Sequence, residues 1–226
     1  MSDGQEKYRR EVEASFRKWF DPKTARLKSA DILKMPPEHW KCVAQGCNNM
    51  NMLRLDRLRQ KDFSGFIQTF SSHDRFKPFL KIIPKLSPAQ YWKLLGEVWT
   101  EIEVFQPDKQ TWLRLFQSKR PNREFLMTSE EHEMLSKLPD IFEIWRGCGD
   151  VSGVYGLSWT LDKKRAEFFA DYAIGFRRKM LTGLKNQANV QPLIVKAKCQ
   201  KADVLALFKR RGESEIVLNP QNVRII

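Results

Sequence analysis

Three short clusters in the last third of the sequence contain residue types suited to chemistry on an anionic ligand. They are Arg146-Gly147, Ser158-Trp159-Thr160 and Glu213-Ser214-Glu215. The planar guanidinium of an arginine presents several donors in a fork that fits phosphate groups. Alternate residues of a β-strand project from the same face, so Glu213 and Glu215 would place two carboxylates side by side. The alternative for this pair is an ion-paired surface, because Lys209, Arg210 and Arg211 come just before it.

The chain after residue 139 predicts the strands that would position these clusters. Short apolar runs separated by Gly and Pro predict strands at residues 141–145, 157–161, 193–197, 213–218 and 223–226. The spacing of apolar residues predicts a helix over 163–176, and a helical turn is expected over 202–208. Each cluster begins or lies on a predicted strand, and the connection over 147–156 is rich in glycine.

The first 139 residues have the pattern of helices. Ser87 and Thr128 are each followed three residues later by Gln or Glu, which is typical of a capped helix start. Shorter helices are expected at 53–59 and 63–70, and another is expected after Pro107. The sequence therefore predicts an α+β protein with a helical N-terminal region, residues 1–139, and a second domain, residues 140–226.

Composition and charge limit the class of protein. The 226 residues are 42% hydrophobic and carry a formal net charge of +13, so the chain can form a core and favours an acidic partner. The first 140 residues contain 25 basic and 19 acidic side chains, and the last 86 contain 15 and 8. The positive charge is therefore denser in the C-terminal part.

The sequence also argues against membrane insertion, secretion and metal binding. There is no run of 18 apolar residues, and the N-terminus has no apolar signal core, so we expect a cytoplasmic protein that does not enter a membrane. Cys42 and Cys47 could be half of a metal site, but none of the three histidines lies at ligand spacing from them. We expect four reduced cysteines and no metal.

The three clusters, taken in order, resemble the arginine, Ser-x-Thr/Ser and Glu-x-Glu motifs of the ADP-ribosyltransferases of the arginine–serine–glutamate class. The resemblance covers roughly residues 140–226. The class that the chain resembles includes toxin-like enzymes of bacteria and phages. It implies a small split β-sheet fold and an enzyme that transfers ADP-ribose from NAD with release of nicotinamide. A helical region before the catalytic fold is frequent among bacterial and phage proteins of this class.

The resemblance also implies roles for individual residues. Arg146 would bind the NAD phosphates or the adenylate ribose, the backbone of Gly147 would bind the nicotinamide amide, and Ser158 would orient the active-site glutamate. Glu215 would bind the ribose 2′-hydroxyl and stabilise positive charge on the sugar, and Glu213 would act as base toward the acceptor. Residues expected to support or line the NAD pocket are Trp159, Thr160, Tyr155 and Phe168, with Tyr172 as a further aromatic candidate.

The charge favours a nucleic-acid acceptor, RNA before single-stranded DNA. The basic residues on which this expectation rests are Arg177, Arg178, Lys179, Lys185, Lys196, Lys198 and Lys201. The seven tryptophans do not cluster with these charges in the sequence, so no base-stacking platform is predicted. The alternatives are modification of arginine on a target protein, a non-enzymatic basic binding module and, ranked low, transfer of a phosphate from RNA to NAD. The N-terminal helices could form a lid, a recognition platform or a docking surface for an antitoxin.

Overall fold

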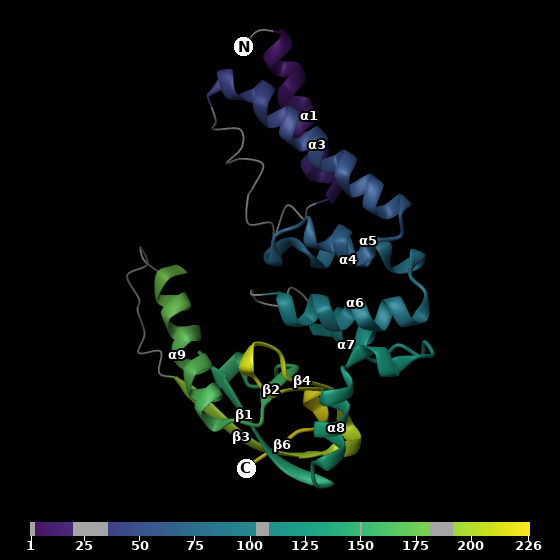
Figure 1. The fold of residues 1–226 in the computed structure, drawn as a ribbon. Coiled ribbons are helices and arrows are strands. Elements are labelled where there is room, and N and C mark those ends of the chain that lie inside the picture. Colours follow the sequence, from purple (N-terminus) through teal and green to yellow (C-terminus); the bar gives the residue numbers. More distant parts are fainter. Residues whose placement is uncertain (1–2, 20–35, 103–108, 150, 181–191) are drawn as a thin grey trace. The chain divides into compact units, whose positions relative to one another are not determined.

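The computed structural model describes residues 3–19, 36–102, 109–149, 151–180 and 192–226 (Figure 1). It has an α+β fold in two compact units, Met1–Pro107 and Asp108–Ile226. The first unit is helical, and the second contains a six-stranded antiparallel sheet. The division between the units falls earlier than the boundary expected at residue 139, because two helices of the N-terminal region belong to the unit that contains the sheet.

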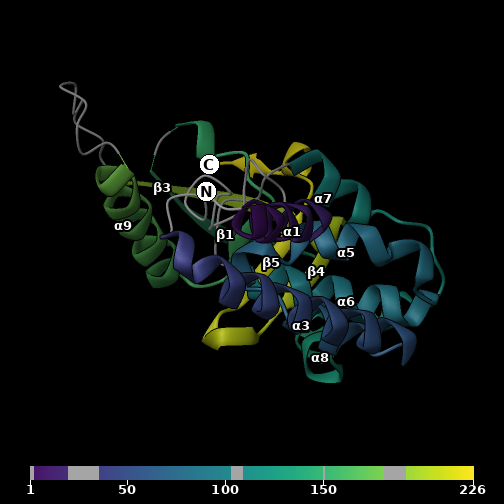
Figure 2. The same ribbon diagram turned by 90° about the horizontal axis from the view of Figure 1, so that it is seen from above.

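The N-terminal unit is built from helices that bury aromatic side chains. Its helices are α1 (Asp3–Trp19), α3 (Trp40–Arg59), α4 (Phe63–Gln68), α5 (Phe76–Ile82) and α6 (Pro88–Glu101). Helix α1 packs against α3, which it crosses at an angle in Figure 1 and in the view from above in Figure 2. Val12 and Phe16 cluster there with Trp40 and Ala44. The capping box predicted at Ser87 is confirmed, since its hydroxyl accepts a hydrogen bond from the Gln90 amide and the Gln90 side chain returns one to the Ser87 amide.

The C-terminal unit begins with two helices and continues into the sheet. Its helices are α7 (Lys109–Phe116), α8 (Ser129–Lys137) and α9 (Lys163–Met180). The strands are β1 (Ile141–Cys148), β2 (Ser158–Thr160), β3 (Leu193–Gln200), β4 (Val204–Phe208), β5 (Glu215–Leu218) and β6 (Arg224–Ile225). They are ordered β4-β5-β2-β1-β3-β6 across the sheet. The capping box predicted at Thr128 is also confirmed, at the start of α8.

One predicted element is wrong. Residues 202–208 were expected to form a helical turn, but only Lys201–Asp203 turn, and Val204–Phe208 form strand β4 paired with β5. Ala206 and Leu207 are both fully buried although neighbouring residues of a strand face opposite sides. A strand buried on both faces has no alternation of polar and apolar residues, so its sequence resembles that of a buried helical segment.

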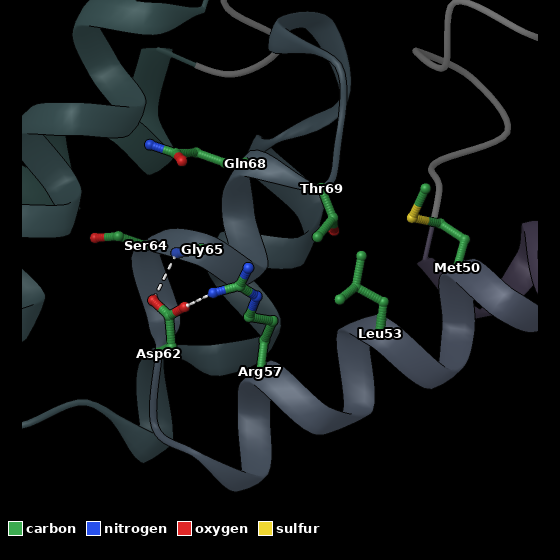
Figure 3. A pocket seen from close by; sticks show the side chains of 8 residues that line it. All are labelled: Met50, Leu53, Arg57, Asp62, Ser64, Gly65, Gln68 and Thr69. Atoms are coloured by element: carbon green, nitrogen blue, oxygen red, sulfur yellow. Dashed lines mark hydrogen bonds and ion pairs between the residues drawn. The ribbon is translucent and has the colours of Figure 1, made fainter.

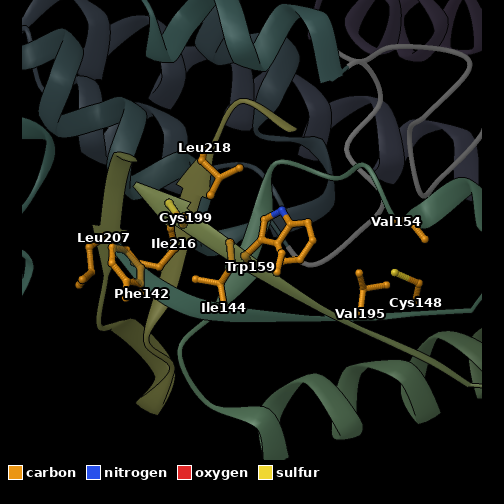
Figure 4. Packing of buried hydrophobic residues seen from close by; sticks show 11 residues of the cluster. Phe142, Ile144, Cys148, Val154, Trp159, Val195, Cys199, Leu207, Ile216 and Leu218 are labelled. Carbon is orange, nitrogen blue, oxygen red and sulfur yellow. The ribbon is translucent and has the colours of Figure 1, made fainter. Parts of the chain in front are cut away.

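The core of the C-terminal unit lies on one face of the sheet. Figure 4 shows Phe142, Ile144, Trp159 and Ile216 among the clustered side chains of this face. Apolar side chains of α8 and the preceding turn pack against the cluster. Helix α9 packs on the opposite face, where Gly147 of β1 meets its backbone.

The two halves of the sheet differ in burial. In β4, β5 and β2, which we call the closed half, most residues of both faces are buried. In β1, β3 and β6, the open half, inward residues such as Ile144 and Ala197 are buried, while Ile141 and Ile194 on the other face are 60% and 40% exposed. The open half is therefore buried on one face, while on the other face α9 packs against β1 and other residues remain exposed.

Candidate active site

The three clusters recognised in the sequence lie on three adjacent strands. Arg146 is on β1, Ser158 opens β2 and Glu215 opens β5, and β2 is paired to both of the other strands. Glu215 is directly opposite Thr160, which is two residues from Ser158 on the same strand face. The sheet therefore brings together residues that are up to 69 positions apart in the chain.

Arg146 is tied to the neighbouring strand and loop through its guanidinium. Nε donates a hydrogen bond of 2.7 Å to the carbonyl oxygen of Gly153, and Nη1 donates one to the carbonyl oxygen of Ser158. Nη2 takes part in neither bond. These contacts hold the glycine-rich connection against the start of β2, so Arg146 shapes the loop in addition to supplying positive charge.

The electrostatics of Arg146 connect it to Glu215. Burial lowers the pKa of the guanidinium from its ordinary value, and the Cys148 thiol and the Glu215 carboxylate oppose this shift. Glu215 therefore lies within electrostatic range of Arg146. The alternation of β1 nevertheless places Arg146 on the face of Ile144 and Cys148, opposite to the face from which Ser158 and Glu215 project.

Gly156 and Trp159 complete the packing around Arg146. A Cβ atom at Gly156 would lie 2.2 Å from Cζ and Nη2 of Arg146, so the close approach of the guanidinium requires glycine. The Trp159 side chain is only 2% exposed, belongs to the core cluster and donates from Nε1 to the Gly156 carbonyl oxygen at 3.0 Å. Trp159 thus supports the loop from inside the core.

Thr160 and Gly147 connect the sheet to helix α9. The buried Thr160 hydroxyl accepts a hydrogen bond of 3.1 Å from the amide of Asp162, whose carboxylate accepts one of 2.8 Å from the Lys164 amide at the helix start. A Cβ atom at Gly147 would lie 1.9 Å from the Ala166 carbonyl oxygen. The side of Gly147 on which a side chain would project is therefore occupied by α9.

The two glutamates follow a connection that is anchored from α8 and α9. Gly212 has φ of 67°, a left-handed conformation that favours glycine, and its carbonyl oxygen accepts a hydrogen bond of 3.4 Å from Arg165. Glu213 has extended backbone but precedes β5, so only Glu215 of the pair lies on the strand. Both glutamates are half-buried.

Glu131 of α8 is a further residue of this region that sequence reasoning did not select. It is 2% exposed, and its carboxylate accepts hydrogen bonds from the amides of Thr128 at 2.7 Å and Lys209 at 2.9 Å. Arg210 Nε lies 3.7 Å from the same carboxylate. Glu131 therefore fixes the chain just before Glu213. Its position in the capping box was the available signal, but that motif indicated only a helix start.

The predicted aromatic residues of the pocket lie on the surface. Tyr155 is 57% exposed, and its carbonyl oxygen accepts a hydrogen bond of 3.2 Å from Lys109. Phe168 and Tyr172 are 54% and 60% exposed on α9, with stacked rings whose centroids are 6.3 Å apart.

Only some of the basic residues expected to bind nucleic acid lie in the part of the chain whose side chains the structure describes. The side chains of Arg177, Arg178 and Lys179 in α9 are not described, and Lys185 lies outside the described residues. Lys196, Lys198 and Lys201 are described, and all three belong to β3 or the turn that follows it. Among the described residues, no group of three or more His, Cys, Asp or Glu side chains could hold a metal ion.

A separate hollow of about 570 Å³ lies within the N-terminal unit, between α3 and α4 (Figure 3). Met50 and Leu53 border it on one side, and Arg57 forms an ion pair with Asp62 beside it. Asp62 also accepts a hydrogen bond of 2.9 Å from the Gly65 amide and so caps α4. The charged groups of this hollow are thus engaged in holding the two helices.

We compared the chain with known protein families, curated proteins and solved structures. No family model, curated protein or solved structure matches this chain. Across the part of the chain that the structure describes, no helix is both long enough and apolar enough to cross a membrane.

Proposed function

We propose that the chain is an NAD-dependent ADP-ribosyltransferase whose reaction centre lies where β1, β2 and β5 adjoin. The observation that carries the proposal is the convergence of the three sequence clusters on three neighbouring strands. Arg146 bonds the backbone of Ser158, and the charge of Glu215 acts on Arg146. This arrangement supports the similarity to the arginine–serine–glutamate class, whose split-sheet fold we propose for the C-terminal unit.

In the proposed reaction the bond between nicotinamide and C1′ of the ribose breaks, and a new bond forms between C1′ and a nucleophilic atom of the acceptor. Nicotinamide leaves with the bonding electron pair. Glu215 would stabilise the positive charge that develops on the ribose and bind its 2′-hydroxyl. Glu213 would accept the proton that the acceptor loses. Arg146, which projects from the opposite face of the sheet, would act by holding the glycine-rich connection against the start of β2 through Gly153 and Ser158.

Three of the residues expected in the NAD site also have roles in the fold. Trp159 lies in the core, Thr160 forms the turn into α9 and Gly147 is covered by α9 on its side-chain side. These three residues have structural reasons for their identities. The proposal therefore depends mainly on Arg146 and Ser158 together with the two glutamates.

For the acceptor we propose nucleic acid, with RNA favoured over single-stranded DNA, because the net charge of +13 suits a polyanion. An enzyme with this activity would act as a toxin-like effector, and the helical N-terminal unit would be available for a regulatory partner such as an antitoxin. Modification of arginine on a protein is the competing outcome of the test below.

The test is incubation of the full chain with labelled NAD and separated RNA, DNA and protein fractions. We expect label in RNA, and no label with the Glu215→Ala variant. Label found only in protein, and released by hydroxylamine, would replace the nucleic-acid acceptor by arginine. If no fraction takes up label and the protein releases no nicotinamide, the chain is not an ADP-ribosyltransferase.

A further inference from the structure

The pairing of β1 with β3 brings a tryptophan among the basic residues of the C-terminal unit. Trp145 is directly opposite Lys196, and Lys198 is opposite both Glu143 of β1 and Arg224 of β6. Residues opposite one another in an antiparallel pair project from the same face of the sheet. Trp145, Lys196, Lys198 and Arg224 therefore share one face of the open half, which we call the Trp145 surface.

The Trp145 surface is only partly open to solvent, because Trp145 and Lys196 are half-buried. Burial alternates along β3, so that Val195, Ala197 and Cys199 face the core while Lys198 is exposed. Arg224 is also exposed. Helix α9 packs against β1 on this face, with a close backbone approach at Gly147, and Lys198 and Arg224 remain exposed.

The charges of this surface are predominantly positive. Lys196 Nζ lies 2.6 Å from a Glu143 carboxylate oxygen and 6.0 Å from the centroid of the Trp145 ring. Glu143 offsets one of the three basic charges, so Lys198 and Arg224 give the surface its excess. A half-buried tryptophan ring beside exposed cations offers the two features that single-stranded nucleic acid requires, a stacking partner for a base and cations for the phosphates.

We propose that the Trp145 surface binds single-stranded nucleic acid, with phosphates on Lys198 and Arg224 and a base stacked on Trp145. The surface also lies on the face of the proposed reaction centre. Trp145, Thr160 and Glu215 are paired in one line across β1, β2 and β5. Since paired strands are about 4.8 Å apart, the backbones of Trp145 and Glu215 are separated by about 10 Å. The role of this surface as the acceptor site rests on the proposed function, whereas its role in binding does not.

The experiment measures binding of a fluorescently labelled 20-nucleotide single-stranded RNA to the full chain by anisotropy, at several salt concentrations and without NAD. We expect Lys198→Ala/Arg224→Ala to weaken binding at least tenfold and to reduce the slope of log affinity against log salt by about 1.4. Trp145→Leu should weaken binding about tenfold with an unchanged salt slope, and Trp145→Phe should restore most of the affinity.

The matched control removes two positive charges elsewhere in the same unit. Lys137→Ala/Lys163→Ala changes two exposed lysines of α8 and α9, and we expect it to alter the affinity less than threefold. The proposal is overturned if the control weakens binding as much as Lys198→Ala/Arg224→Ala, if neither surface variant changes binding, or if an acidic polypeptide displaces the RNA at equal charge. Thermal unfolding confirms that each variant is folded.

NAD turnover, measured separately, distinguishes the two proposals. If the Trp145 surface binds RNA but the protein releases no nicotinamide, the proposed enzymatic function is refuted and the proposed binding surface is supported. If the protein releases nicotinamide and the surface variants bind RNA normally, only the proposal that the Trp145 surface binds RNA is refuted.

Discussion

The closed and open halves of the sheet show how one antiparallel sheet can serve two purposes. In the closed half most residues of both faces are buried, whereas the open half buries one face and leaves residues of the other, such as Ile194 and Lys198, exposed. Electrostatic interactions are stronger where water is excluded, so the border of the closed half is a suitable place for Glu215 to stabilise charge. The exposed face of the open half is suited to binding a large, flexible partner.

The comparison is tested most strongly by removing the same side chain from each half. Ile216 of β5 is fully buried, and Ile216→Ala should lower the free energy of unfolding by about 2–5 kcal/mol. Ile194 of β3 is 40% exposed, and Ile194→Ala should cost less than about 1 kcal/mol. Chemical denaturation measures both changes. Equal losses would show that the two halves are not differently covered.

Stability should depend on the carboxylate of Glu131, which holds the chain just before Glu213. Glu131→Ala leaves the amides of Thr128 and Lys209 without their acceptor and Arg210 without its nearby carboxylate, so we expect a loss of about 2–3 kcal/mol by denaturation. The adjacent Glu130, which is exposed and pairs with Lys209, provides the control. Glu130→Ala should have little effect, and a similar loss in both variants would contradict the role of Glu131.

The contact between the open half and α9 depends on a glycine. Gly147→Ala would push Cβ against the α9 backbone and should destabilise the fold by about 1–3 kcal/mol in thermal unfolding. Gly175 of α9 has open space around its Cβ direction, so Gly175→Ala should be neutral or slightly stabilising. If Gly147→Ala were stable but unable to bind NAD, the glycine would be needed for the ligand and not for packing.

Thiol chemistry can separate the two faces of β3. Burial, together with the charge of Asp203, raises the pKa of Cys199 to about 12. At pH 8 it should therefore react with iodoacetamide on the order of 100-fold more slowly than a thiol placed on the outward face by Lys198→Cys. Because the unfolded chain releases this proton first, the contribution of Cys199 to stability should decrease as the pH rises from about 9.0 toward 12. Equal alkylation rates would contradict the alternation.

The sequence predicted those features that depend on local patterns. The capping boxes at Ser87 and Thr128 and the alternating strand that became β3 follow from side-chain types within a few residues. It failed at β4, where burial of both faces removes the alternation. It also could not show that Trp145 lies opposite Lys196, because strand register depends on pairing between segments about 50 residues apart.

The candidate site was predictable in its residue types but not in its geometry. The order of the three clusters pointed to Arg146, Ser158 and Glu215, and the structure places them on adjacent strands. Only the folded chain shows that Trp159 is buried in the core and that Gly147 packs against α9. A motif residue can be required by the fold and by the ligand, and sequence alone does not separate these reasons.

The most direct test of the proposed reaction is to measure, by chromatography, the nicotinamide that the full chain releases from NAD. The wild-type protein and Glu133→Gln, which changes an exposed glutamate of α8, should release nicotinamide at equal rates. Glu215→Gln keeps the shape of the side chain but removes its charge, and its rate should fall by on the order of 100-fold or more. Absence of release by the wild type, or an unchanged rate in Glu215→Gln, would contradict the proposal.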